Sequence, residues 1–309
     1  MAVTLCMVVK DEAENLPACL ASVLPFVDDA LIADTGSSDG SAELIRGITG
    51  KAAVPLSLDP ANCHSLTPAR NALYAQVKTD WILYFDADER LADGAGTALR
   101  TALAENATAT DGYFGQWETF IDGEPGFEDY KLFVFRSHLR KRGFAHANVQ
   151  LDIRMKGGDE QWLHGLRVNH HPSAAIMPGK RELYWRRLVQ SMSLEAGWLR
   201  HNWFAGYMCF QDGRFEEAHR LFAPLIESRS MLFPVEGLNA RMVAVDMLVR
   251  EGRLAEAAAR IAEGLSFAAE AGTDFEVKVN RRIVPWFAAA QAHLCEGRPD
   301  AVRAYRFSA

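Results

Sequence analysis

The sequence predicts an α/β fold in which a mainly parallel sheet is followed by an all-α region of helical hairpins. In the first half of the 309-residue chain, short β-branched or aromatic runs alternate with helical patterns. This alternation is typical of parallel sheets with helices on both faces. In the second half, three similar helix–Gly–helix segments follow one another. We therefore expect two domains, at residues 1–180 and 181–309.

The strands and helices of the first half are short and follow in regular order. Apolar runs predict four buried strands, at Val3–Val9, Ala30–Ala33, Ala53–Leu58 and Trp81–Phe85. Helical patterns lie between them at Glu12–Val23, Ser41–Arg46 and Pro68–Val77. Aromatic-rich strands at Tyr113–Phe120 and Lys131–Arg136 flank a loop rich in Gly, Pro and acidic residues. That arrangement predicts an antiparallel extension of the sheet.

The helical half contains a degenerate repeat. Each copy joins a helix end, a Gly turn and an Ala-containing helix start, at Phe210–Ala218, Val249–Ala257 and Leu294–Val302. The turn glycines are Gly213, Gly252 and Gly297, which are 39 and 45 residues apart. This spacing predicts tetratricopeptide-like helical hairpins that bury their apolar faces against their neighbours.

Composition excludes several classes of protein. With 33 Lys plus Arg against 40 Asp plus Glu, the net charge is −7, so no nucleic-acid partner is expected. The five cysteines are widely spaced, which does not indicate a disulfide framework. A reducing, cytoplasmic location is therefore expected. The longest apolar stretch, Ile283–Ala290, is shorter than the ~18 residues of a membrane span. Attachment to the inner face of a membrane as a peripheral protein is the alternative location.

Polar residues follow three of the predicted strands. The first strand leads into Lys10, Asp11 and Glu12, and the second into the Gly- and Ser-rich segment Asp34–Ser41. The fourth leads into Asp86-Ala87-Asp88-Glu89. Ligands of parallel sheets bind at this carboxyl edge. Two carboxylates separated by one residue provide hard oxygen ligands for Mg²⁺ or Mn²⁺, which can bridge two phosphates.

These segments together resemble the nucleotide-binding half of a family 2, GT-A type (Rossmann-like) glycosyltransferase. The matching segments are Leu5–Glu12, Asp34–Ser41, Ala69–Asn71 and Trp81–Glu89. The resemblance implies a nucleoside-diphosphate sugar donor, usually UDP-linked, a metal at the Asp-x-Asp pair, and inversion at the anomeric carbon. It extends to members in which a tetratricopeptide-like region follows the enzyme domain, and to bacterial lipopolysaccharide-core glucosyltransferases. Cell-surface glycan synthesis is therefore an expected role.

The resemblance also implies site residues at matching positions. Those implied for nucleotide binding are Val9, Lys10, Asp11, Glu12, Asp34, Thr35, Gly36, Arg70, Asp86 and Ala87. Asp86, Asp88 and His170 are implied to bind Mn²⁺ or Mg²⁺. A guanidinium such as that of Arg70 can hold a phosphate bidentately. For His170, the alternative is a loop histidine without a ligand.

The acceptor half departs from the family pattern. The family has a His-Glu pair whose Glu is a candidate base, but here that Glu position falls on Ala147 or Gln150. An inverting transfer needs a base on the acceptor hydroxyl. Asp129 resembles an acidic position of the lipopolysaccharide subgroup and is the leading substitute. Glu118 and His146 are the next candidates, and an ordinary turn carboxylate is the alternative for Asp129.

Three functions are compared. The leading one is a metal-dependent inverting glycosyltransferase acting on a glycan, lipid-linked or peptide acceptor. A sugar-phosphate nucleotidyltransferase is disfavoured, because Val8–Glu12 lacks the Gly-rich, Arg- and Lys-containing loop typical of that class. The third is a catalytically impaired nucleotide-sugar-binding module whose helical repeats bind a protein partner. The basic run Arg140–Arg142 is interpreted as a solvated turn rather than as a site for a phosphorylated acceptor.

Overall fold

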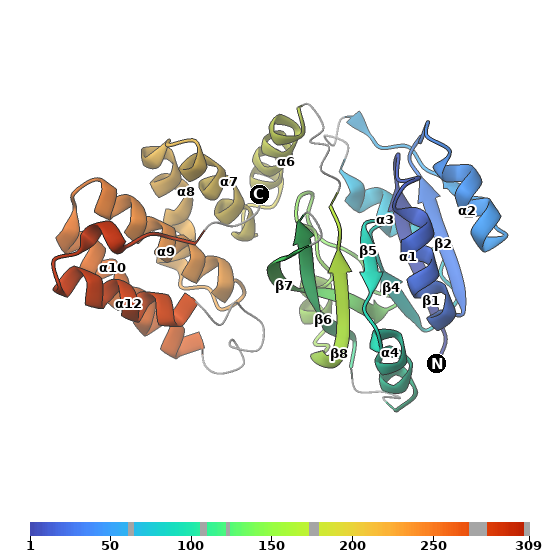
Figure 1. Cartoon of the computed structure of the whole chain (residues 1–309). Coiled ribbons are helices and arrows are strands. Elements are labelled where there is room, and N and C mark those ends of the chain that lie inside the picture. The colour runs from blue at the N-terminus through green and yellow to red at the C-terminus, as the bar shows by residue number, and fades with distance from the viewer. Residues whose placement is uncertain (61–64, 106–109, 122–123, 173–178, 272–282, 306–309) are drawn as a thin grey trace. The chain divides into compact units, whose positions relative to one another are not determined.

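The chain forms two compact units, which Figure 1 shows in colours that run from the N-terminus to the C-terminus. They comprise Met1–Arg187 and Leu188–Ala309. The computed structural model describes residues 1–60, 65–105, 110–121, 124–172, 179–271 and 283–305. We describe each unit by itself.

The first unit is built on an eight-stranded sheet of order β3-β2-β1-β4-β7-β6-β8-β5. Its parallel half consists of β1 (Val3–Val9), β2 (Asp29–Asp34), β3 (Val54–Pro55) and β4 (Trp81–Tyr84). Because these strands are parallel, their carboxyl ends meet at one edge, where Val9 lies opposite Asp34. The β1 bounds agree with the expected strand. The edge strand β3 is shorter than expected, as its Pro55 has no N–H to donate.

The other half of the sheet is mixed. It contains β5 (Glu89–Leu91), β6 (Gly112–Ile121), β7 (Glu124–Arg136) and β8 (Glu160–His170). The expected antiparallel extension is confirmed, since β7 pairs antiparallel with both β4 and β6. Strand β8 then returns parallel to β6 and pairs antiparallel with β5, which places His170 opposite Glu89. His170, which is 81 residues beyond Glu89 in the sequence, is thereby brought beside the segment that follows β4.

Helices cover both faces of this sheet. They are α1 (Leu16–Val23), α2 (Ser41–Thr49), α3 (Leu66–Tyr74), α4 (Ala95–Glu105) and α5 (Gln150–Met155), with the short 3₁₀ helix η1 (Leu24–Phe26). One core cluster joins the sheet to α1 and α4, and another joins it to α3 and α5. Along β4, Trp81 and Leu83 belong to the first cluster, whereas Ile82 and Tyr84 belong to the second. This alternation agrees with a strand buried on both faces.

Helix α1 begins later than the sequence pattern indicates. The expected start was Glu12, but the helix begins at Leu16, with Pro17 in its first turn. Asp11 adopts a left-handed φ of 53°, which interrupts helical geometry before that point. The residues between β1 and α1 therefore form a loop at the carboxyl edge of the sheet.

The second unit is entirely helical in the residues that the structure describes. Its helices are α7 (Arg200–Gln211), α8 (Phe215–Ser228), α9 (Pro234–Arg250), α10 (Leu254–Ala271) and α12 (Ile283–Cys295), followed by the 3₁₀ helix η3 (Pro299–Ala301). Helix α6 (Lys180–Leu194) runs across the division between the two units. No described helix of either unit is both long and apolar enough to cross a membrane.

The three repeated segments form the expected turns between helices, and all three turns have the same geometry. Gly213, Gly252 and Gly297 have φ angles of 72°, 75° and 68°. In each case the N–H of the following Arg donates to the carbonyl five residues earlier, at 2.9, 2.9 and 2.8 Å. This is the Schellman arrangement, in which a left-handed Gly ends a helix and the freed carbonyl groups are still hydrogen-bonded. The sequence repeat is therefore a repeated helix end.

Glycines also allow close packing inside the helical unit. A Cβ atom at Gly206 would lie 2.4 Å from the ring of Phe222, and one at Gly264 would lie 2.5 Å from the ring of Phe287. Both rings are fully buried. The rings therefore occupy the space that a side chain would need.

We predict that Gly264→Ala destabilises the helical unit by about 1–3 kcal/mol, because the added methyl group overpacks the core against Phe287. Gly47→Ala in α2 is the matched control, since nothing lies within 4 Å of a Cβ at that helical position. It should be neutral or stabilising by up to about 1 kcal/mol. Urea unfolding followed by far-UV circular dichroism measures both. Equal effects of the two substitutions would contradict the packing argument.

A buried carboxylate holds the segment between β7 and α5 in place. The Asp152 side chain is 0% exposed and accepts hydrogen bonds from Arg140 N at 2.9 Å and from Arg142 Nη2 at 2.6 Å. Lys156 Nζ donates to it at 2.8 Å. Burial opposes the charged form, but the bonds from Lys156, Arg142 and Arg140 outweigh it and lower the pKa of Asp152. Asp152 therefore contributes to stability while it is ionised.

We predict that Asp152→Asn lowers the free energy of unfolding by about 2 kcal/mol at pH 7, because two cationic partners lose their anion. A lowered pKa stabilises the fold above the unfolded-state value of about 4, and this contribution is lost as the pH falls below it. The difference between wild type and variant should therefore shrink between pH 5 and pH 3. Asp300→Asn, at a fully exposed carboxylate, is the control. A difference independent of pH would refute the assignment.

Candidate active site

Two loops at the carboxyl edge of the parallel strands carry the residues expected to bind a nucleotide. The loop after β2 folds around Asp34, whose Oδ1 accepts from Gly36 N at 3.0 Å and from Ser37 N at 2.9 Å. The loop after β1 is tied to it, because Asp11 Oδ1 accepts from Ser38 N at 2.7 Å. Gly36 has a φ of 101°, a conformation that glycine adopts without strain.

Further contacts join the ends of β1 and β2. The carbonyl oxygen of Val9 accepts from both the N–H and the hydroxyl of Thr35, at 3.0 and 3.1 Å. Lys10 is exposed, whereas Glu12 is half-buried and burial raises its pKa. All the residues expected from these two loops therefore gather at one edge of the sheet.

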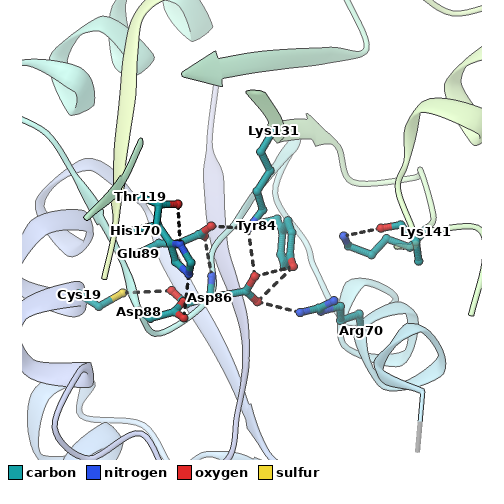
Figure 2. A network of polar contacts seen from close by, with 11 residues as sticks. Cys19, Arg70, Tyr84, Asp86, Asp88, Glu89, Thr119, Lys131, Lys141 and His170 are labelled. Atoms are coloured by element: carbon teal, nitrogen blue, oxygen red, sulfur yellow. Dashed lines mark hydrogen bonds and ion pairs between the residues drawn. The ribbon is translucent and has the colours of Figure 1, made fainter. Parts of the chain in front are cut away.

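A dense group of charges follows β4, and we call it the Asp86 cluster: Arg70, Tyr84, Asp86, Glu89 and Lys131 (Figure 2). Asp86 Oδ1 accepts from Arg70 Nη2 at 2.8 Å and lies 3.1 Å from the Tyr84 hydroxyl oxygen. Asp86 Oδ2 accepts from Lys131 Nζ at 3.0 Å and from Tyr84 OH at 2.8 Å. The cluster thus joins α3, the end of β4 and β7 through one carboxylate.

Glu89 is the second anion of the cluster. Its side chain is 1% exposed, and its Oε1 accepts from Lys131 Nζ at 2.6 Å. Its Oε2 accepts from the backbone N–H of Asp86 at 2.9 Å. Glu89 therefore holds both the Lys131 ammonium group and the backbone that presents Asp86.

The two anions respond differently to this environment. Removal from water opposes the charge of Asp86, but Lys131 and Arg70 outweigh that cost and lower its pKa. Burial, together with the neighbouring Asp86, raises the pKa of Glu89. For Lys131, burial is outweighed by Asp86 and Glu89, which raise its pKa. Asp86 is therefore the anion that the two cations stabilise most.

Asp88 lies in a different environment from Asp86. Its Oδ2 is 3.1 Å from His170 Nε2, and the Nδ1 of His170 is 3.1 Å from Thr119 Oγ1. The backbone N–H of His171 donates to Asp88 O at 2.8 Å. Trp117 stacks on the His170 ring, with centroids 4.4 Å apart. The Asp88 loop is therefore held against the end of β8.

The Asp88–His170 pair has the chemistry of a divalent-metal site. It offers a carboxylate oxygen and an imidazole nitrogen, and Thr119 could accept from Nδ1–H and so orient the ring for Nε2 to bind a metal. Among the described residues, no three His, Cys, Asp or Glu side chains are placed to hold a metal together. Water or ligand oxygens would have to complete the coordination. Asp86 could join only in competition with Arg70 and Lys131, the two cations that already pair with it.

The structure describes the side chains of two of the three expected candidates for a base, Glu118 and His146. Thr119 and Trp117 contact His170, so the alternation along β6 places Glu118 on the opposite face. His146 is exposed and contacts the hydroxyl of Tyr184. Asp129 pairs through its backbone with Trp117, but its side chain, like all those of residues 121–129, lies outside the described structure.

The site contains residues that sequence reasoning missed. Tyr84, Glu89 and Lys131 each contact Asp86, yet none was expected there. The sequence does mark Lys131, because it is a cation at the start of the apolar run Leu132–Phe135. Its role nevertheless depends on β7 lying beside β4, which that pattern alone does not show.

The run Arg140–Arg142 also differs from its interpretation as a solvated turn. Arg142 is paired with Asp152, and Lys141 is only 6% exposed. Lys141 Nζ lies 3.8 Å from the centre of the Tyr84 ring and donates to Ala147 O at 3.2 Å. Burial, then Arg70 and Lys131, lower its pKa. The expectation was therefore wrong for Lys141, because the fold turns it inward beneath the Asp86 cluster.

Comparison with known proteins shows which family the chain belongs to. Residues 4–185, more than half of the chain, match glycosyl transferase family 2. A curated relative, the TPR repeat-containing protein Synpcc7942_0270 of Synechococcus elongatus, is 46% identical over 101 residues, or 33% of this chain. The match spans about a quarter (24%) of that relative's length. The crystal structure of S. aureus TarS 1-349 aligns with 100% of this chain and 94% of that chain, at a TM-score of 0.42 and 11% identity.

The family match contains both loops of the carboxyl edge, the Asp86 cluster and the Asp88–His170 pair. The expected α/β sheet followed by helical hairpins is confirmed by the structure. The chain belongs to glycosyl transferase family 2 and carries a glycosyltransferase domain.

Proposed function

We propose that this protein is a metal-dependent inverting glycosyltransferase that moves a sugar from a nucleoside-diphosphate sugar, UDP-linked by preference, to a hydroxyl acceptor. The acceptor is a glycan, a lipid-linked sugar or a peptide, and the role is in bacterial cell-surface glycan synthesis. The observation that carries the proposal is the juxtaposition of the Asp86 cluster and the Asp88–His170 pair at one sheet edge in a family 2 chain.

The donor nucleotide would bind across the two loops after β1 and β2. Asp11 and Asp34 carry carboxylates that can accept from a base N–H or a ribose hydroxyl. Arg70 Nε is buried without a hydrogen-bond partner among the described residues, so the guanidinium has a donor available for a phosphate oxygen. The buried cysteines Cys6 and Cys19, which form no disulfide among the described residues, agree with a reducing compartment, and we place the protein in the cytoplasm.

Asp86, Asp88 and His170 would hold Mn²⁺ or Mg²⁺. When bound, such an ion stabilises the negative charge that develops on the leaving diphosphate. The chain's own contribution is to orient the ligands: Thr119 fixes the His170 ring, and Tyr84 fixes the Asp86 carboxylate. Preorganised donors and cations of this kind stabilise transition-state charge without further reorganisation.

The acceptor hydroxyl must lose its proton as it attacks the anomeric carbon. The sugar–phosphate bond breaks on the opposite face, and the electron pair leaves with the diphosphate. Asp129 remains our proposed base, with Glu118 and His146 as the next candidates. Glu118 is the weaker of those two, since it lies on the face of β6 opposite His170.

We predict that turnover and tight donor binding need a divalent metal. The assay is a panel of four donors: UDP-glucose, UDP-N-acetylglucosamine, UDP-galactose and GDP-mannose. At least one donor should be hydrolysed with Mn²⁺, and none should be hydrolysed in EDTA. Asp88→Ala should lose most turnover and leave the unfolding temperature nearly unchanged, because its carboxylate has one side-chain partner and is 25% exposed. Full activity in EDTA, or in this variant, would overturn the metal assignment.

We predict that Asp129→Asn lowers transfer about 10²–10⁴-fold, the usual contribution of a general base, with UDP and metal affinity nearly unchanged. Glu118→Gln and His146→Gln serve as the comparison variants in the same assay. Calorimetric titration of UDP separates loss of the base from loss of the donor site. If Asp129→Asn transfers normally, the base is one of the other two residues. If it fails to bind UDP, Asp129 belongs to the donor pocket.

A second candidate function is a catalytically impaired nucleotide-sugar-binding module whose helical repeats bind a protein partner. The observation that favours it is that Ala147 and Gln150 occupy the positions expected for the family's Glu. The donor panel distinguishes the two functions. Binding of a nucleotide sugar without hydrolysis or transfer of any donor would favour the module.

A further inference from the structure

The ammonium group of Lys131 is held by several contacts in the candidate site. It lies in β7, opposite Gly115 of β6, and its ammonium contacts Asp86 at 3.0 Å and Glu89 at 2.6 Å. The ammonium also lies 4.1 Å from the centre of the Tyr84 ring. No residue of the two nucleotide-binding loops takes part in these contacts. Lys131 thus approaches the donor site from the antiparallel half of the sheet.

The contacts of Asp86 create a competition. Asp86 accepts from Arg70 on one oxygen and from Lys131 on the other, and the single proton of the Tyr84 hydroxyl is a third donor, with its oxygen 3.1 Å from Oδ1 and 2.8 Å from Oδ2. A metal ion that binds Asp86 must therefore compete with these partners for the carboxylate. The two charged partners, Arg70 and Lys131, oppose a cation more strongly than the neutral Tyr84 hydroxyl does.

A nucleoside diphosphate relieves this competition, because its oxygens are alternative acceptors for the displaced cations. Glu89 keeps the Lys131 ammonium in place during such an exchange, since it is buried and bonded to the Asp86 backbone as well. A cation that leaves Asp86 therefore stays at the site rather than moving to solvent. Ammonium groups bind phosphate as point charges and need no fixed bidentate geometry.

We propose that Lys131 is a phosphate-binding residue of the donor site, which exchanges Asp86 for the diphosphate when metal and nucleotide bind together. This inference rests on the proposed function, since it takes the donor to be a nucleoside diphosphate. It makes the binding of metal and of nucleotide cooperative. Lys131 also has opposite effects on the binding of the two ligands. Its charge weakens the binding of the metal alone and strengthens the binding of the phosphates.

The test is Lys131→Met, with the two ligands titrated separately by calorimetry. Mn²⁺ alone should bind about 3–10-fold more tightly to the variant, because a competing cation has been removed. UDP in saturating Mn²⁺ should bind about 10–100-fold more weakly, the cost of losing a charge-assisted hydrogen bond. Uridine, which has no phosphates, should bind equally to both proteins. A purely structural role for Lys131 would not raise the affinity for metal.

Two further variants control the test. Lys131→Arg keeps the charge and should hold UDP within about 3-fold of wild type. Lys51→Met removes a lysine paired with Asp29 at the opposite, amino edge of the sheet, and should change neither titration. Circular dichroism checks that each variant is folded, and Lys131→Gln replaces Lys131→Met if the latter unfolds.

The two titrations test separately whether Lys131 binds phosphate and whether it exchanges with Asp86. Unchanged UDP affinity in folded Lys131→Met or Lys131→Gln would overturn the phosphate role, and unchanged Mn²⁺ affinity would overturn the exchange with Asp86. If wild type binds neither UDP nor GDP with Mn²⁺, the proposed function itself fails, and this inference fails with it.

Discussion

The ion pairs on Asp86 are the interaction on which the candidate site depends. A carboxylate at the end of a buried strand is costly unless cations and hydrogen-bond donors compensate it. Arg70 and Lys131 supply the charges, and the Tyr84 hydroxyl donates a further hydrogen bond. Because these partners come from α3, β7 and the end of β4, one carboxylate links three separate elements of the glycosyltransferase domain.

The sheet order makes this convergence possible. Strand β4 lies between β1 and β7, so Asp86 has the loops after β1 and β2 on one side and the antiparallel half on the other. The β5–β8 pairing then places His170 opposite Glu89, one residue beyond Asp88. The parallel half thus provides the two loops and Asp86, and the mixed half provides Lys131 and His170. Neither half contains the complete site.

Local patterns predicted much of this fold, and long-range pairings account for most of what they missed. The apolar run at Val3–Val9 gave the bounds of β1, and three glycines marked the helical turns, because a buried strand and a left-handed helix end each have a local signature. Arg70 and Asp88 lie in motifs that could be compared directly. Lys131 begins an apolar run and Lys141 lies in a basic run, but neither pattern shows that these cations turn inward. That depends on the packing of β7 and α3 beside Tyr84.

The Asp-x-Asp pair shows most clearly how the structure adds to the motif. In sequence, Asp86 and Asp88 are equivalent carboxylates two residues apart. In the fold, Asp86 accepts from two cations and a hydroxyl, whereas the Asp88 side chain has, among the described residues, one hydrogen-bond contact, to an imidazole. Groups of the same type whose environments differ in this way take different roles. Asp88 is therefore the carboxylate suited to bind a cation first, and Asp86 the one suited to respond when an anion draws its partners away.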